Sequence, residues 1–151
     1  MRDAPRSAFP HFLAIPTRWM DNDVYGHVNN VQYYSYFDTA VNQFLIARGV
    51  LDIHQGDVVG FVVDSGCSYF SPVAFPDMVH VGVRVAKLGT SSVRYELAIF
   101  RNDEQSPAAA GHFIHVYVER GSSCAVPIPD AVRRVLTTIA SSVAPLDAVE
   151  R

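Results

Sequence analysis

Lysine and cysteine are scarce in this chain of 151 residues, and both shortages limit what the protein can do. Lys87 is the only lysine, so any bound anion would be met mainly by arginine, which suits planar contacts to phosphate or carboxylate. The formal net charge is −3, whereas nucleic-acid-binding domains normally carry a basic face. The sequence therefore predicts no nucleic-acid partner.

The chain holds two cysteines, Cys67 and Cys124, with no Cys-x-x-Cys pair and no Cys/His cluster at metal spacing. This pattern excludes a typical zinc site and fits a reducing compartment, so we expect a cytoplasmic protein without a metal or redox cofactor. No apolar run approaches the roughly 20 residues that span a bilayer, and the first residues lack the apolar core of a signal peptide. We expect no membrane partner.

What is present is an ordinary globular composition, with 49% hydrophobic and 18% charged residues. The length suits one domain with a sizeable core. We expect a loose arm over residues 1–10, a single domain over 11–141 and a frayed tail over 142–151.

One long helix is predicted from Val31 to Arg48. Its buried stripe follows helical spacing and consists of Tyr33, Phe37, Val41, Phe44 and Leu45. Asn29 or Asn30 can cap its start, and Gly49 stands where a left-handed residue would end it.

Most of the remaining chain alternates as strands do, over residues 11–19, 58–73, 77–87, 91–101 and 108–120, with a short helix at 129–141. Consecutive strands with short turns predict an antiparallel sheet, and strands of about 11 residues would reach roughly 36 Å, long enough to curl along a helix of about 27 Å. The fold class is α+β. Polar and aromatic residues on the other sides of the helix predict a symmetric homodimer, with a dimer-of-dimers tetramer left open.

The densest chemical signal lies just before this helix, where Asp21, Asp23, Gly26, His27 and Asn29 fall within nine residues. The free N–H groups at a helix start, with the positive end of its dipole, stabilise developing negative charge. A carboxylate beside them can act as nucleophile or as a base for water. An ordinary polar loop that only caps the helix is the alternative from spacing alone.

The pattern D-x-D-x-x-G-H-V-N-N-x-x-Y, from Asp21 to Tyr33, resembles the 4-hydroxybenzoyl-CoA thioesterase branch of hotdog proteins. Its H-V-N-N-x-x-Y part is also similar to plant acyl-carrier-protein thioesterases. Supporting segments are Y-F-S-P-V-A-F-P-D (69–77), K-L-G-T-S-S-V-R-Y-E (87–96) and V-P-I-P (126–129), so the resemblance covers roughly residues 12–140. It implies a hotdog fold, a long central helix wrapped by a curved antiparallel sheet of about five strands.

The resemblance also implies roles for individual residues. Asp23 matches the catalytic carboxylate, Asn30 the position whose backbone N–H polarises the thioester carbonyl, and His27 the assisting histidine of the carrier-protein enzymes. Tyr25 stands where those enzymes have Asn, and Asp21 is expected to order the loop. Expected substrate contacts are Tyr25, Gly26, Asn29, Tyr33, Ser65 (towards a facing subunit), Ser91, Ser92 and Arg94.

These residues predict an acyl-thioester hydrolase acting on acyl-CoA, or on an acyl-carrier protein, with coenzyme A present only as part of the substrate. Some relatives grip the nucleotide phosphates with a basic run near residue 90, where this chain has Gly-Thr-Ser-Ser. CoA phosphates could instead meet Arg84, Arg94 or Arg101, although solvated strand faces are the ordinary place for such side chains. A non-catalytic acyl-thioester binding module and a hotdog dehydratase are the rival functions.

Overall fold

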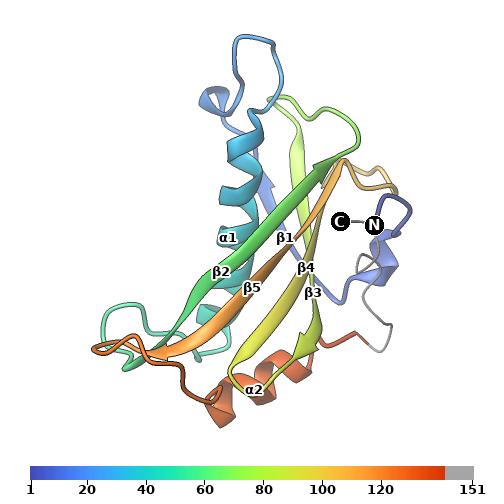
Figure 1. The fold of residues 1–151 in the computed structure, drawn as a ribbon. Helices are drawn as coiled ribbons and strands as arrows, with labels where there is room; N and C mark the ends of the chain where they lie inside the picture. The colour runs from blue at the N-terminus through green and yellow to red at the C-terminus, as the bar shows by residue number, and fades with distance from the viewer. Residues whose placement is uncertain (142–151) are drawn as a thin grey trace.

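A five-stranded antiparallel sheet curls around one long helix in the computed structural model, which describes residues 1–141 (Figure 1). The expected α+β hotdog architecture is confirmed. The strands are β1 (His11–Pro16), β2 (Val58–Tyr69), β3 (Met78–Leu88), β4 (Ser92–Arg101) and β5 (Ala109–Glu119). Their order across the sheet is β1-β3-β4-β5-β2.

The core lies between the concave face of the sheet and the helix α1 (Asn30–Ala47). The strand alternation predicted from sequence decides which side chains enter it, because successive residues of a strand point to opposite faces. From β3 and β4 the buried residues are Val79, Val81, Val83, Val85, Val93, Tyr95, Leu97 and Ile99. The helix supplies the predicted stripe, together with Tyr36 and Ala40.

Both ends of α1 follow the residues expected to set them. The side chain of Asn29 accepts a hydrogen bond from the N–H of Val31, so Asn29 rather than Asn30 is the cap. Gly49 has φ +73°, the left-handed conformation that ends helices and that glycine adopts at little cost.

The strand β2 follows α1 but lies at the far edge of the sheet from β1, beside β5. Its register against β5 shifts between Val62 and Asp64, which marks a bulge. The other edge of β2 pairs with no strand of the described chain. Three residues at this edge, Phe61, Val62 and Val63, are 46%, 48% and 60% exposed.

Residues 1–10 are not a loose arm in the structure. They lie on the side of the sheet away from α1, where a short 3₁₀ helix, η1 (Arg6–Ala8), interrupts the segment (Figure 1). Ala4 and Phe9 are buried there against Phe100 and other apolar residues of the outer face. The tail expected over 142–151 lies outside the described residues.

The last helix, α2 (Asp130–Thr137), is shorter than expected and covers the end of the sheet opposite the start of α1 (Figure 1). Its buried residues are Val132 and Leu136. Within residues 1–141, none of the helices has the length and apolarity to cross a membrane. The same residues contain no group of three His, Cys, Asp or Glu side chains that could hold a metal ion.

Candidate active site

The segment between β1 and α1 folds into a compact hairpin-like loop. The strand β1 ends at Pro16, earlier than expected, and a 3₁₀ turn, η2 (Trp19–Asp21), follows. Asn22 then pairs with Val28 as an isolated antiparallel bridge. The Val28 N–H donates to the carbonyl of Val73 at 2.7 Å, which ties the loop to the segment after β2.

Asp23 is half-buried in this loop, and both its backbone and its side chain are engaged. Its N–H donates to the carbonyl of His27 at 3.0 Å, and its own carbonyl accepts from the N–H of Gly26. The carboxylate oxygen Oδ1 accepts from the N–H of Tyr25 at 2.9 Å. Gly26 has φ +83°, which lets the chain reverse between Asp23 and His27. The loop thus holds the Asp23 carboxylate just ahead of the helix start.

The helix start offers one uncommitted donor. The N–H of Val31 is taken by the Asn29 side chain, and the N–H of Gln32 by the Asn29 carbonyl. The N–H of Asn30 has no hydrogen-bond acceptor within residues 1–141, and Asn30 is exposed. A free N–H at the positive end of a helix is suited to an oxygen that gains negative charge.

Asp21 anchors this loop to α1, as the sequence predicted that it would order the segment. Its side chain is fully buried and accepts from the Tyr36 hydroxyl at 2.8 Å and from the Arg18 N–H at 2.8 Å. The Arg18 guanidinium also forms an ion pair with the Asp21 carboxylate. The backbone carbonyl of Asp21 accepts from the N–H of Asn29 at 2.9 Å. Burial raises the pKa of Asp21, but the hydrogen bonds from Arg18 and Tyr36 outweigh it, so the pKa lies below its usual value.

The other predicted loop residues face solvent within this chain. His27 is exposed, and Tyr25 is 84% exposed. Val24, Trp19 and Met20 also protrude, at 95%, 78% and 68% exposure. These exposed side chains form a mainly apolar rim around the site. Among them, the sequence analysis had predicted a substrate contact only for Tyr25.

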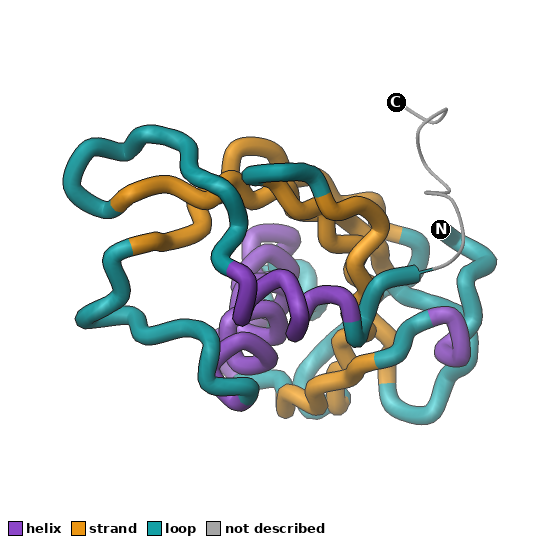
Figure 2. The backbone as a smooth tube through the Cα atoms, turned by 90° about the horizontal axis from the view of Figure 1, so that it is seen from below, coloured by secondary structure: helices purple, strands orange, loops and turns teal. Residues whose placement is uncertain are grey.

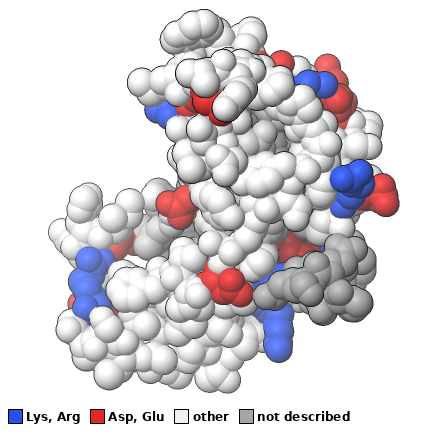
Figure 3. All heavy atoms as spheres, turned by 45° about the horizontal axis from the view of Figure 1, so that its top comes forward, with Lys and Arg blue, Asp and Glu red and all other residues white. Residues whose placement is uncertain are grey.

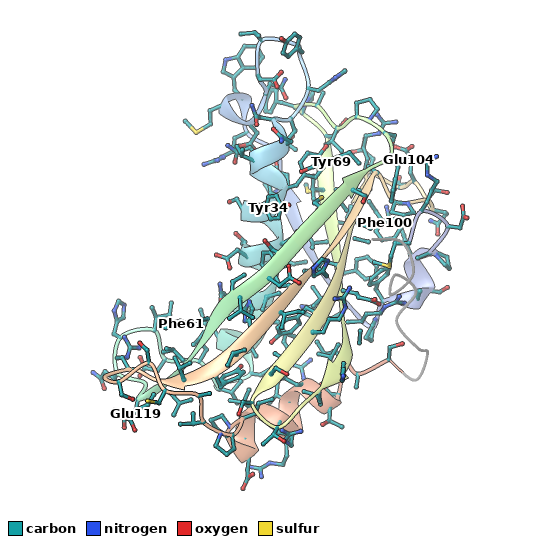
Figure 4. All side chains as sticks on the ribbon, in the orientation of Figure 1. Tyr34, Phe61, Tyr69, Phe100, Glu104 and Glu119 are labelled. Atoms are coloured by element: carbon teal, nitrogen blue, oxygen red, sulfur yellow. The ribbon has the colours of Figure 1, made fainter. Side chains whose placement is uncertain are left out.

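Tyr69 is a site residue that the sequence analysis had not singled out. Its hydroxyl donates to the carbonyl of Asn30 at 3.3 Å, and its ring packs edge-on against the buried Tyr33 with centroids 5.0 Å apart. Figure 4 shows Tyr69 and Tyr34 at the same end of the space between β2 and α1. Burial raises the pKa of Tyr33 to about 12, so its hydroxyl is uncharged where the ring packs against Tyr69. The sequence signal that could have identified Tyr69 is its position as the first residue of the 69–77 motif.

The remaining predicted contacts are not brought to Asp23 within one chain. Ser91 and Ser92 lie at the turn between β3 and β4, at the α2 end of the sheet, where the Ser91 carbonyl accepts from Tyr117. Arg94 lies on the outer face of β4, in register with Ile114. Ser65 lies on the free-edge strand β2, opposite Phe113, and is exposed.

The arginines that might have met CoA phosphates have protein partners. Arg84 is not a solvated side chain: it is 3% exposed and its Nε donates to buried Glu96 at 2.8 Å, while its guanidinium lies over the Phe9 ring. Arg101 pairs with Glu104 and donates to the carbonyl of Pro72. On the face shown in Figure 3, charged side chains are scattered with no basic cluster. The described residues therefore show no preformed phosphate clamp on these strands.

A curved sheet around one helix, with a carboxylate loop and a free N–H at the helix start, defines a hotdog protein of the thioesterase class. The family model of the thioesterase-like superfamily matches residues 17–136, and the chain belongs to that superfamily. Its membership and the site together indicate acyl-thioester hydrolysis in general.

Two solved structures of Pseudomonas aeruginosa proteins are similar to most of this chain. The PA5185 protein is 56% identical, with 93% of this chain and 98% of that chain covered and a TM-score of 0.90. The PA2801 protein, described as a putative thioesterase, is 32% identical over 85% of this chain and 98% of that chain, with a TM-score of 0.79. The Bacillus subtilis (strain 168) protein YsmA, which is uncharacterized, is 23% identical over 87% of this chain and 88% of its own length.

Proposed function

We propose that this protein hydrolyses the thioester of an acyl group carried on a pantetheine arm, which coenzyme A and acyl-carrier proteins share. The observation that supports this proposal is that one loop holds both the Asp23 carboxylate and the uncommitted N–H of Asn30 at the start of α1. The N–H stabilises the oxyanion that forms on the carbonyl oxygen. Asp23 can take a proton from a water that attacks the carbonyl carbon; the C–S bond then breaks, and the sulfur takes up that proton and leaves as a thiol. Alternatively, Asp23 attacks the carbonyl carbon itself and the C–S bond breaks; water then hydrolyses the acyl-aspartyl anhydride to the free acid, and the protons released by that water end on the sulfur and the carboxylates.

The working unit that we propose is a homodimer joined along β2. An exposed strand edge with apolar side chains is a template for pairing with a second copy, and symmetric dimers are the commonest oligomers. Antiparallel pairing of two β2 strands would extend the sheet across both subunits. It would also cover the side of α1 that carries Tyr34 and Asp38, which β2 leaves open.

The test of the proposed function is Asp23→Asn, assayed by thiol release on a panel of acyl-CoA and acyl-carrier-protein thioesters. We expect kcat on the best substrate to fall about 100-fold or more, because the amide can neither attack nor take a proton. Asp103→Asn, at an exposed acid in the loop after β4, is the control and should keep wild-type turnover. Unchanged turnover in Asp23→Asn, or a wild type that cleaves no thioester on the panel, contradicts the proposal.

A further inference from the structure

A cavity of about 580 Å³ lies on the outer face of the sheet, the face that points away from α1. The start of the chain forms one wall of this cavity, and the strands β2 and β5 form its floor. In Figure 2 the start of the chain, marked N, and the long helix α1 lie on opposite sides of the strands. The volume is in the range of pockets that hold small molecules. The lining includes Arg2, Asp3, Gly66, Ser68, Phe70 and His112.

His112 forms the floor of the cavity with an unsatisfied ring nitrogen. Its neighbour Phe113 packs in the core, so His112 points to the outer face. Gly66 lies opposite it on β2, where a Cβ would come within 2.8 Å of the His112 Cε1, so the imidazole ring lies over the glycine. The Nε2 atom is buried and has no hydrogen-bond partner within residues 1–141, because the Asp64 Oδ1 is 3.6 Å away. Buried polar atoms are normally hydrogen-bonded, and a polar ligand atom in the cavity would satisfy this one.

Two side chains of opposite charge stand at the mouth of the cavity. Arg2 and Asp3 are both exposed, and neither forms an ion pair or a hydrogen bond with another described residue. The Arg2 guanidinium lies over the Phe70 ring, 5.0 Å from its centroid, which holds it beside the cavity. A guanidinium binds carboxylate or phosphate through paired N–H groups, and a carboxylate accepts hydrogen bonds from an ammonium group. The lining therefore offers one ligand a cation, an anion and a buried imidazole.

We propose that this cavity binds a small zwitterion, a molecule that carries an ammonium group together with a carboxylate or phosphate group. Arg2 takes the anionic group, Asp3 takes the ammonium group, and the His112 Nε2 bonds a polar atom at the floor. The buried Arg84 on the same face does not take the anion, because it is paired with Glu96. The site lies across the sheet from α1, so it is separate from the proposed hydrolysis at Asp23.

The first experiment measures binding by calorimetry with two zwitterions, L-serine and phosphoethanolamine. Acetate, inorganic phosphate and ethylamine are the probes with a single kind of charge. We expect one or both zwitterions to bind about tenfold or more tightly than each of these, because each charged contact contributes separately. Tighter binding of L-serine would assign a carboxylate as the anionic group, and tighter binding of phosphoethanolamine a phosphate. No binding of either zwitterion, or equally tight binding of a singly charged probe, overturns the proposal.

The second experiment removes the charges at the mouth. Arg2→Gln and Asp3→Asn should each weaken zwitterion binding about tenfold, and both positions are exposed, so the fold should tolerate them. Arg134→Gln and Asp103→Asn are the matched controls, since both residues are exposed and lie outside the lining, and they should keep the wild-type affinity. Unchanged affinity in Arg2→Gln and Asp3→Asn overturns the proposal.

The third experiment tests the floor. Gly66→Ala adds a Cβ that pushes the His112 ring aside, so the affinity should fall, whereas Gly121→Ala, whose Cβ meets nothing within 4 Å, should keep it. If Gly66→Ala fails to fold, the wild type decides by NMR. The Cε1–H signal of His112, identified by its loss in His112→Gln, should shift as the zwitterion is added. A signal that stays in place at saturation would overturn the placement of the ligand.

Discussion

Asp21 is the residue on which the geometry of the candidate site most depends, although the proposed reacting group is Asp23. It is buried where a carboxylate is costly unless it is hydrogen-bonded, and Arg18 and Tyr36 satisfy it. Through its carbonyl it also holds Asn29, the cap of α1. One buried acid thus connects the loop that carries Asp23, the cap and the helix.

We predict that Asp21→Asn lowers the free energy of unfolding by about 2–4 kcal/mol, because an amide nitrogen would face donors in a buried site. Tyr36→Phe, which leaves the Arg18 pair intact, should cost about 1 kcal/mol. Urea unfolding of the three proteins measures both values.

The difference in unfolding free energy between the wild type and Asp21→Asn should also depend on pH. The pKa of Asp21 is lower in the folded protein than in the unfolded chain, so the carboxylate contributes stability above its usual pKa and loses it as the pH falls through the folded value. The difference between wild type and Asp21→Asn should therefore shrink below about pH 4. A difference that stays constant from pH 7 to pH 3 would show that the charge of Asp21 does not stabilise the fold.

At the scale of elements, β5 carries a buried histidine towards α1. His115 stacks beside Phe113 and meets Tyr95 edge-on, so its ring fills space as an aromatic residue would. Its pKa of about 4 means that the folded protein binds this proton less readily than the unfolded chain, where the usual value is 6.5. Stability should then fall as the pH drops from 6.5 to 4.

We predict that this single group removes about 3 kcal/mol of unfolding free energy between pH 6.5 and pH 4. His115→Phe cannot take up the proton, so its stability should change less over that interval than that of the wild type. Urea titrations at several pH values give the two slopes. Equal slopes would mean that His115 does not titrate differently in the two states.

At the scale of the whole molecule, the two edges of the sheet differ. The edge strand β1 has six residues and ends at Pro16, whereas β2 has twelve and exposes an apolar stretch at its free edge. A long apolar edge of this kind invites pairing, and natural proteins commonly protect such an edge or use it for assembly. The proposed dimer uses β2 for this reason.

We predict that the wild type sediments at twice its chain mass and that Val63→Lys shifts it towards the monomer. Val63 is 60% exposed, so a lysine there puts a charge on the free edge without disturbing the core of one chain. Thr137→Lys, at an exposed position on α2, should remain dimeric. Analytical ultracentrifugation decides, and a dimeric Val63→Lys would place the contact elsewhere.

Local patterns predicted most of the elements well. The periodicity of α1 and the alternation of β3 and β4 are properties of neighbouring residues, and they matched the structure within a few positions. The end of β1 was placed too late because residues 17–19 remain compatible with an extended chain until Asp21 draws them into a turn. The loop that carries Asp23 could be predicted as a candidate site because its polar residues, Asp21 to Asn29, lie within nine positions of sequence.

Local patterns could not predict contacts between residues that are far apart in the sequence. No local pattern places Arg84 against Glu96 on the outer face, or brings Ala4 and Phe9 to cover it. Tyr69 reaches Asn30 across 39 positions, and the Val28 N–H meets the Val73 carbonyl only because the sheet curls around α1.

By itself the sequence determined the elements, the fold class and the loop that carries Asp23, since each rests on spacing along the chain. The tertiary structure decided which donor at the helix start is free and which arginines are already paired. Those properties depend on which surfaces are buried together, and burial is set by packing between segments that the order of residues does not bring close.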